Sequence, residues 1–301
     1  MDDDLVDLSH LTPAAQRIAV LPAAERVAHV RADRWIGYTR ANAALTRLEA
    51  LFEWPSKQRM PNLLLLGPTN NGKSMIVEKF RRTHPQVSLP EREQIPVLVL
   101  QMPSDPTVIR FYVALLAAMG APLRPRQRLA ELEQVALELL RAVGVRVLVI
   151  DELHNVLAGT VPVRREFLNL LRFLGNELRI PLVGVGTRDA YLAIRSDDQL
   201  ENRFEPLTLP RWDVDADTRS LLASFAASFP LRRPSDIAGV EMSTYLLTRS
   251  EGTIGELSRL LTDAAIAALD SGEESINRAT LLLAAYTGPT ERRRLFERGL
   301  A

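Results

Sequence analysis

One stretch of this chain limits its possible folds more than any other, the eight residues Gly-Pro-Thr-Asn-Asn-Gly-Lys-Ser at positions 67–74. It follows an apolar run, Asn62 to Leu66, and precedes residues with the spacing of an amphipathic helix. A phosphate-binding loop requires this context between a strand and a helix, because its glycines let backbone amides converge on phosphate oxygens. The N-terminus of the following helix adds the positive end of its dipole. The stretch therefore predicts a nucleotide-binding loop.

The side chains of this loop are expected to divide the contacts between them. Lys73 should reach the β- and γ-phosphates of ATP, and Ser74 should offer its hydroxyl to Mg²⁺, because a hard cation prefers oxygen ligands. The other expected nucleotide contacts are Gly67, Pro68, Thr69, Asn70, Asn71 and Gly72. The competing interpretation is a glycine-rich turn that matches the pattern by coincidence. The strand before it and the helix after it argue against that.

Apolar runs alternate with helical patterns as far as residue 210, which is typical of a parallel sheet with helices on both faces. The expected strands are Asn62–Leu66, Val97–Gln101, Val145–Ile150, Pro181–Val185 and Pro206–Leu209. Beyond residue 210 only helical patterns remain, at residues 215–229, 235–248, 254–269 and 275–286. The sequence predicts an α/β fold, an αβα sandwich with a parallel five-stranded sheet, followed by a small all-helical lid. The expected parts are a helical arm at 1–36, the nucleotide-binding α/β domain at 37–210, the lid at 211–287 and a tail at 288–301.

An acidic pair follows the third expected strand. Asp151 and Glu152 should emerge at the carboxyl edge of the sheet, beside the nucleotide loop. We expect Asp151 to hold Mg²⁺ through water, and Glu152 to orient and deprotonate the water that attacks the phosphate. The alternative is a pair that only caps the next helix. His154 extends the string to Asp-Glu-Leu-His, as in some helicases, although a lone histidine is more often used for packing or capping.

Two further positions are candidates for contact with the γ-phosphate. Thr187 follows the fourth expected strand, whose tip should lie between the acidic pair and the loop. It is a candidate phosphate sensor, and a plain turn after a buried strand is the competing account. Arg203 precedes the last strand, where an arginine can reach out of its subunit and complete a neighbour's site. The alternative for Arg203 is a surface salt bridge.

Composition excludes several other classes of site. The 301 residues contain no cysteine, which rules out disulfides, thiolate catalysis and cysteine-based metal sites. The four histidines lack the spacing of a metal-binding pair, so Mg²⁺ is expected to arrive with the nucleotide. The 37 basic and 37 acidic residues cancel, so any nucleic-acid contact must use a local basic patch. No apolar run could span a bilayer and the start is acidic, so we expect a cytoplasmic protein with no membrane partner.

At these motifs the sequence resembles the AAA+ ATPases, and more narrowly the TniB group of transposition regulators, which is related to TnsC, MuB and IstB. The resemblance covers most of residues 30–270. The segments that carry it are Arg31–Ile36, Arg59–Leu63, Asn70–Ser74, Asn169–Leu178, Val183–Thr187 and Asp198–Phe204. The loop is typical of nucleoside triphosphatases in general, and the surrounding segments carry the narrower resemblance.

The resemblance implies an ATP- and Mg²⁺-dependent ATPase that forms a homo-oligomer, a ring or a helical filament, on double-stranded DNA. Such a protein selects target sites and recruits or activates a transposase, without itself cutting or joining DNA. The family's Walker A, Walker B, first-sensor and arginine-finger positions are occupied, in chain order, by Lys73 and Ser74, Asp151 and Glu152, Thr187, and Arg203. The lid departs from the pattern, because Gly255 stands where many AAA+ proteins place a second sensor arginine and Arg259 lies one turn later.

The residues themselves say least about which side chains contact DNA and about the cellular process in which the protein acts. The basic candidates for phosphate contact are Arg124, Arg126, Arg128, Arg164 and Arg165, and solvated surface is the alternative for each cluster. A helicase loader or replication initiator is the alternative function, although an initiator of this type usually adds a winged-helix domain, for which the residues after Tyr286 are too few. A third alternative is an interaction protein that binds nucleotide without turnover, against which Glu152 argues.

Overall fold

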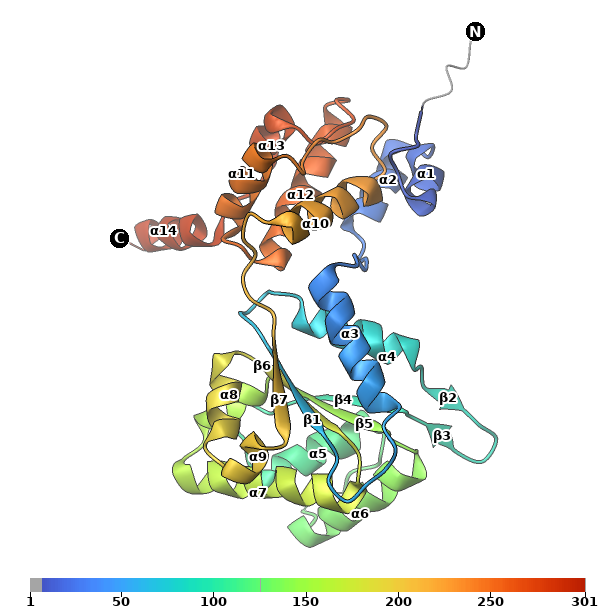
Figure 1. Ribbon diagram of the computed structural model, residues 1–301, viewed down its shortest axis with the longest axis vertical. Helices are drawn as coiled ribbons and strands as arrows, with labels where there is room; N and C mark the ends of the chain where they lie inside the picture. Colours follow the sequence, from blue (N-terminus) through green and yellow to red (C-terminus); the bar gives the residue numbers. More distant parts are fainter. Residues whose placement is uncertain (1–6, 125, 301) are drawn as a thin grey trace. The chain divides into compact units, whose positions relative to one another are not determined.

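The computed structural model describes residues 7–124 and 126–300. The chain divides into two compact units, which Figure 1 shows as a sheet-containing part and a helical part. The first unit is Arg40–Pro210. The second combines the described residues up to Thr39 with those from Arg211 onward. Residues far apart in the sequence therefore build the helical unit together.

A five-stranded parallel sheet forms the centre of the first unit. Its strands are β1 (Asn62–Leu66), β4 (Val97–Gln101), β5 (Val147–Asp151), β6 (Leu182–Gly186) and β7 (Phe204–Thr208). Their order across the sheet is β4-β5-β6-β1-β7, and every neighbouring pair is parallel. The predicted fold class is confirmed. Because all strands run the same way, their carboxyl ends meet at one edge, where β6 ends between β5 and β1.

Helices cover both faces of this sheet (Figure 1). Leu64 and Leu66 of β1 belong to the main core, which they share with the helices that follow β4, β5 and β6. Leu63 and Leu65 are equally buried and, by the alternation of a strand, point to the opposite face, where α3 and α4 lie. The flanking helices are α3 (Thr39–Phe52), α4 (Lys73–Thr83), α5 (Val108–Ala118), α6 (Leu129–Ala142), the 3₁₀ helix η1 (Leu153–Ala158), α7 (Val161–Leu178), α8 (Arg188–Arg195) and α9 (Asp198–Glu201).

Some elements of this unit differ from the sequence prediction. A short antiparallel hairpin, β2 (Val87–Ser88) with β3 (Glu93–Gln94), was not predicted, because two-residue strands carry no periodic signal. Strand β5 begins two residues later than expected. The N–H of Val145 donates to Leu140 O of α6 at 3.1 Å, so this residue closes the turn after the helix and does not join the strand.

The second unit contains helices only. They are α1 (Pro13–Ala19), α2 (Ala23–Arg31), α10 (Ala216–Ser228), α11 (Val240–Ser250), α12 (Ile254–Asp270), α13 (Arg278–Leu283) and α14 (Pro289–Gly299). The predicted all-helical C-terminal region is confirmed, and α14 occupies the expected tail. Helix α11 starts later than predicted because the Ser235 hydroxyl accepts a hydrogen bond from Ile276 N at 2.8 Å, which ties this segment into a loop. None of the helices in the described parts of the chain combines the length and apolar character needed to cross a bilayer.

A buried ion pair joins the two sequence segments of the helical unit. Arg26 of α2 is 2% exposed, donates through Nε to Pro230 O at 2.9 Å and pairs with the carboxylate of Glu274. Glu274 also accepts from Arg232 N at 3.0 Å. Burial raises the pKa of Glu274, but the hydrogen bonds and charges of Arg26 and Arg232 together lower it by more. The net shift of the pKa is downward. The buried charge of Arg26 thereby links helix α2 to the C-terminal part of the helical unit.

Replacing Arg26 by Met should destabilise the helical unit by about 2–4 kcal/mol, because it removes the guanidinium that pairs with Glu274 and donates to Pro230 O. Thermal and urea unfolding of the full chain would measure the loss. The lowered pKa of Glu274 means that the pair contributes fully above its ordinary pKa of 4.5 and is lost as the pH falls below that value. The parent should therefore lose its advantage over the variant in acid. An equal effect from Arg17→Met, at an exposed position of α1, would contradict the role of the pair.

Candidate nucleotide-binding site

The loop between β1 and α4 has the backbone shape that its sequence predicts. Gly72 precedes α4 with φ 84°, in the left-handed region that favours glycine, and Asn70 has φ 59°. Gly67 has no room for a side chain, because a Cβ there would lie 2.8 Å from Leu209 O. The Asn71 side chain is buried and donates through Nδ2 to Leu209 O and Pro210 O, both at 2.9 Å. The loop is thus fixed to the segment that follows β7.

Lys73 begins α4 and is only 7% exposed. Its Nζ donates to two carbonyls of the loop, Gly67 O at 2.9 Å and Pro68 O at 2.7 Å. Burial lowers the pKa of Lys73, whereas the nearby carboxylates of Glu152 and Asp151 raise it. The amine is therefore enclosed by the loop and lies within the electrostatic reach of the acidic pair.

Ser74 and Asp151 meet across the carboxyl edge of the sheet. The Ser74 hydroxyl donates to Asp151 Oδ2 at 2.9 Å, and Asp151 Oδ1 accepts from Glu152 N at 2.8 Å. A hydroxyl and a carboxylate are ligands that Mg²⁺ prefers, directly or through water. The two side chains come from elements far apart in the sequence, and their contact fits the divalent cation that accompanies a nucleotide.

Glu152 lies at a turn that the backbone holds firmly. Its φ of 55° is unusual for a residue other than glycine. Its carbonyl accepts from Asn155 N at 2.9 Å, and Asn155 Nδ2 donates to Met102 O at 3.0 Å, beyond the end of β4. Sequence reasoning missed Asn155, whose role depends on a contact with a distant segment. The alternative of a pair that only caps the next helix is not what the structure shows, because no side chain caps η1.

Thr187 follows the tip of β6, which lies between β5 and β1 in the sheet. Its hydroxyl accepts from Asp189 N at 3.4 Å and so caps the start of α8. The residue is half-buried and lines a cavity beside the loop. The structure thus places Thr187 at the expected edge and also gives it a local structural role.

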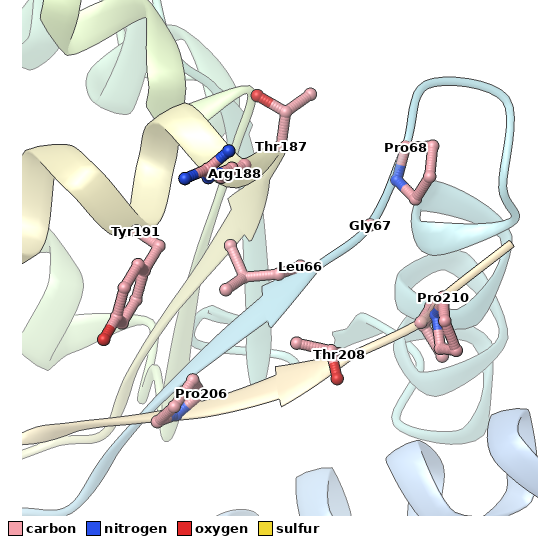
Figure 2. A pocket seen from close by; sticks show the side chains of 10 residues that line it. Leu66, Gly67, Pro68, Thr187, Arg188, Tyr191, Pro206, Thr208 and Pro210 are labelled. Carbon is pink, nitrogen blue, oxygen red and sulfur yellow. The ribbon is translucent and has the colours of Figure 1, made fainter.

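The cavity beside the loop has a volume of about 560 Å³ (Figure 2). Its lining consists of Leu66, Gly67, Pro68, Thr187, Arg188, Tyr191, Pro206, Thr208, Leu209 and Pro210. Figure 2 shows Arg188 and Tyr191 of α8 to one side, with Leu66 and Thr208 of the neighbouring strands beside them. Of the predicted site residues only Gly67, Pro68 and Thr187 contribute, so the cavity adjoins the loop without including the acidic pair.

Arg203 lies at the other edge of the sheet from the loop. It precedes β7, which is parallel to β1, and its carbonyl accepts from the N–H of Asn62 at the start of β1 at 3.0 Å. The length of β1 therefore separates Arg203 from Gly67, about 15 Å at the usual rise of a strand. Its guanidinium donates to Asn176 Oδ1 of α7 at 2.8 Å.

The five basic candidates for DNA contact differ in their surroundings. The cluster Arg124, Arg126 and Arg128 is exposed in the segment between α5 and α6. Arg164 is engaged within the chain, because it donates to Gly159 O at 2.8 Å and to Leu157 O at 2.7 Å. Arg165 is exposed.

In the helical unit, Arg259 lies on α12 one turn beyond Gly255. Burial raises the pKa of Asp263, and the charges of Arg259 and Arg31 lower it. Arg259 and Arg31 therefore lie close enough to Asp263, within the helical unit, for their charges to act on its carboxylate.

Known proteins share the fold and part of the sequence of this chain. Similar solved structures include Aeropyrum pernix Orc1 in complex with DNA (TM-score 0.57, 20% identity, 86% of this chain and 68% of that chain). Others are Cdc6p from Pyrobaculum aerophilum (0.55, 15%, 82% and 67%) and the Thermotoga maritima RuvB Holliday junction branch migration motor (0.52, 17%, 85% and 72%). This likeness shows that the chain shares its fold with these proteins. No curated protein sequence matches the chain. The family model described as bacterial TniB protein matches residues 26–214, more than half of the sequence, and the chain therefore belongs to the TniB family.

Proposed function

We propose that this chain is a Mg²⁺-dependent ATPase, with the nucleotide held at the loop of residues 67–74. The observation that carries the proposal is the contact between the Ser74 hydroxyl and Asp151 Oδ2 at 2.9 Å, beside the enclosed amine of Lys73. A nucleotide site needs a cationic side chain for the phosphates and oxygen ligands for Mg²⁺. Lys73 provides the first, and Ser74 and Asp151 provide the second, at the edge where β1 and β5 end.

Each residue has a distinct part in the proposed reaction. Lys73 contacts the β- and γ-phosphates, and Ser74 and Asp151 hold the cation, Asp151 through water. Magnesium, when bound, offsets the negative charge of the phosphates. Glu152 orients the attacking water and accepts its proton at the carboxylate, and Thr187 contacts the γ-phosphate. The loop amides would hold the phosphates in place while the water attacks, and the bond between the γ-phosphorus and the bridging oxygen would break.

We further propose that the ATP-bound chain assembles on double-stranded DNA, selects the target of transposition and recruits or activates a transposase in the cytoplasm. Membership of the TniB family supports this, and the similar Orc1 structure contains DNA. Arg124, Arg126, Arg128 and Arg165 are exposed and would contact phosphates, which gives salt-dependent affinity with little dependence on sequence. Residues 211–287 would act as the lid domain.

One series of measurements tests this assembly. Gel shifts on double-stranded DNA and electron microscopy would be run with ATP, with ADP and without nucleotide. We expect an ordered DNA-bound oligomer, a ring or a filament, only with ATP. Affinity capture from the native host should recover a transposase. Recovery of a replicative helicase and no transposase would instead support a helicase loader and overturn the choice made here.

Replacing Glu152 by Gln should slow hydrolysis about a hundredfold while ATP and Mg²⁺ binding persist, because the amide cannot accept the proton of the attacking water. The expected phenotype is a trapped, DNA-bound assembly. Phosphate release and ATP affinity, measured on the same preparation, separate the two effects. Glu201→Gln, at an exposed position of α9, is the matched control. If Glu152→Gln lost ATP affinity as severely as a variant of Lys73, the division of roles between the two residues would be wrong.

A further inference from the structure

His154 is the one motif residue that the proposed reaction does not use, and it lies against Glu152. Its Nε2 is 3.2 Å from Glu152 Oε2, within ion-pairing distance. Throughout residues 7–124 and 126–300, no other side chain lies within hydrogen-bonding or ion-pairing distance of the Glu152 carboxylate. The side chain of Glu152 is 37% exposed and that of His154 only 27%. The imidazole is thus the more buried member of the pair.

The other side of the imidazole packs against the tip of β6. A Cβ added to Gly186 would lie 3.4 Å from His154 Nδ1 and 3.5 Å from His154 N. Nδ1 is buried and has no hydrogen-bond partner in the part of the chain that the structure describes. Gly186 directly precedes Thr187. The ring therefore occupies the space between the Glu152 carboxylate and the backbone that presents the proposed phosphate sensor.

The backbone of Glu152 is held by hydrogen bonds, so the side chain is the part of this residue that can still rotate. Asp151 Oδ1 accepts from Glu152 N at 2.8 Å and the Glu152 carbonyl accepts from Asn155 N at 2.9 Å, so the turn is held from both sides. A glutamate side chain has three rotatable bonds, and a base that must meet a water loses rate when it is misplaced by about 1 Å. A contact that fixes the carboxylate therefore has a catalytic consequence.

We propose that His154 is a positioning residue, which holds the Glu152 carboxylate toward the attacking water and keeps it in register with Thr187 through the tip of β6. This inference rests on the proposed ATPase activity. The contact is made by Nε2, so a side chain that offers a nitrogen donor at similar reach should replace it. A side chain that only fills the space should not. A packing role would be satisfied by either.

The test compares His154→Leu, which fills the space, with His154→Gln, which keeps a nitrogen donor. In the full-length protein with saturating DNA, His154→Leu should lower kcat about tenfold at unchanged KM and unchanged ATP affinity, since it disturbs orientation and not binding. His154→Gln should recover most of that loss. Introduced into the Glu152→Gln background, His154→Leu should cause no additional loss, because the group that it positions is already absent.

Any of three losses would overturn the inference. They are an equal loss in His154→Leu and His154→Gln, a loss of ATP affinity and thermal stability that accounts for the fall in rate, or a further tenfold loss in the Glu152→Gln background. Turnover of His154→Leu at or above the parent rate would also overturn it. Failure of the proposed function is distinguishable, because the parent itself would then release no phosphate. If the parent hydrolyses ATP, Glu152→Gln does not, and His154→Leu has the kcat of the parent, only this inference fails.

Discussion

The Lys73→Ala variant should lose ATP hydrolysis by about a thousandfold and bind ATP much more weakly than the parent. The lysine amine is 7% exposed and is held by the carbonyls of Gly67 and Pro68, at the point where the phosphates are expected. Removing it deletes a charge-assisted contact from an enclosed site, where such contacts are strongest. Equilibrium binding of a fluorescent ATP analogue and steady-state phosphate release would measure the two losses separately.

The matched control for this variant is Lys79→Ala, which removes the same charge from an exposed position of the same helix, α4. It should bind and hydrolyse ATP like the parent. A Lys73→Ala protein that retained normal turnover would remove the nucleotide site from the loop. Equal losses in the two variants would indicate damage to α4 in place of a lost phosphate contact, and circular dichroism of both proteins would reveal such damage.

The loop and the sheet could be predicted because their determinants are local. Strands β1 and β4 have the predicted bounds, since both are runs of apolar residues that the sheet buries on two faces. The left-handed conformation of Gly72 is a consequence of the loop sequence itself, whereas Gly67 is crowded by Leu209 O of a distant segment. Parallel strands then place Asp151 and Thr187 at the same edge as the loop, whatever the details of the helices between them.

What could not be predicted depends on contacts between distant segments. Nothing near Asn155 indicates that its amide donates to Met102 O, beyond the end of β4. The pairing of Arg26 with Glu274 likewise joins residues from the two ends of the sequence. Such contacts are set by tertiary packing, which overrides local propensity and has no periodic signature.

Arg203→Ala should lower hydrolysis by the assembled protein about a thousandfold while leaving nucleotide binding by the isolated subunit unchanged. Within its own chain Arg203 is separated from the loop by the length of β1, about 15 Å, so it cannot complete its own site. An arginine that contacts a neighbour's γ-phosphate acts only when two subunits pack together, and arginine fingers contribute effects of this size. Hydrolysis per subunit in the parent should therefore rise with protein concentration and with added double-stranded DNA, and the variant should show no rise.

Mixing the Arg203→Ala and Glu152→Gln variants tests this prediction most directly. Arg203→Ala has an intact Glu152 and lacks the finger, whereas Glu152→Gln has the finger and lacks the base, so a mixed assembly contains some complete sites. Two nearly inactive proteins should together recover measurable hydrolysis, in proportion to the contacts between unlike subunits. Arg219→Ala, at an exposed position of α10, should behave like the parent and serves as control. If Arg203→Ala hydrolysed ATP like the parent at every concentration, or if the mixture stayed inactive, Arg203 would serve only its hydrogen bond to Asn176, and the finger would have to be sought at Arg188 or Arg195.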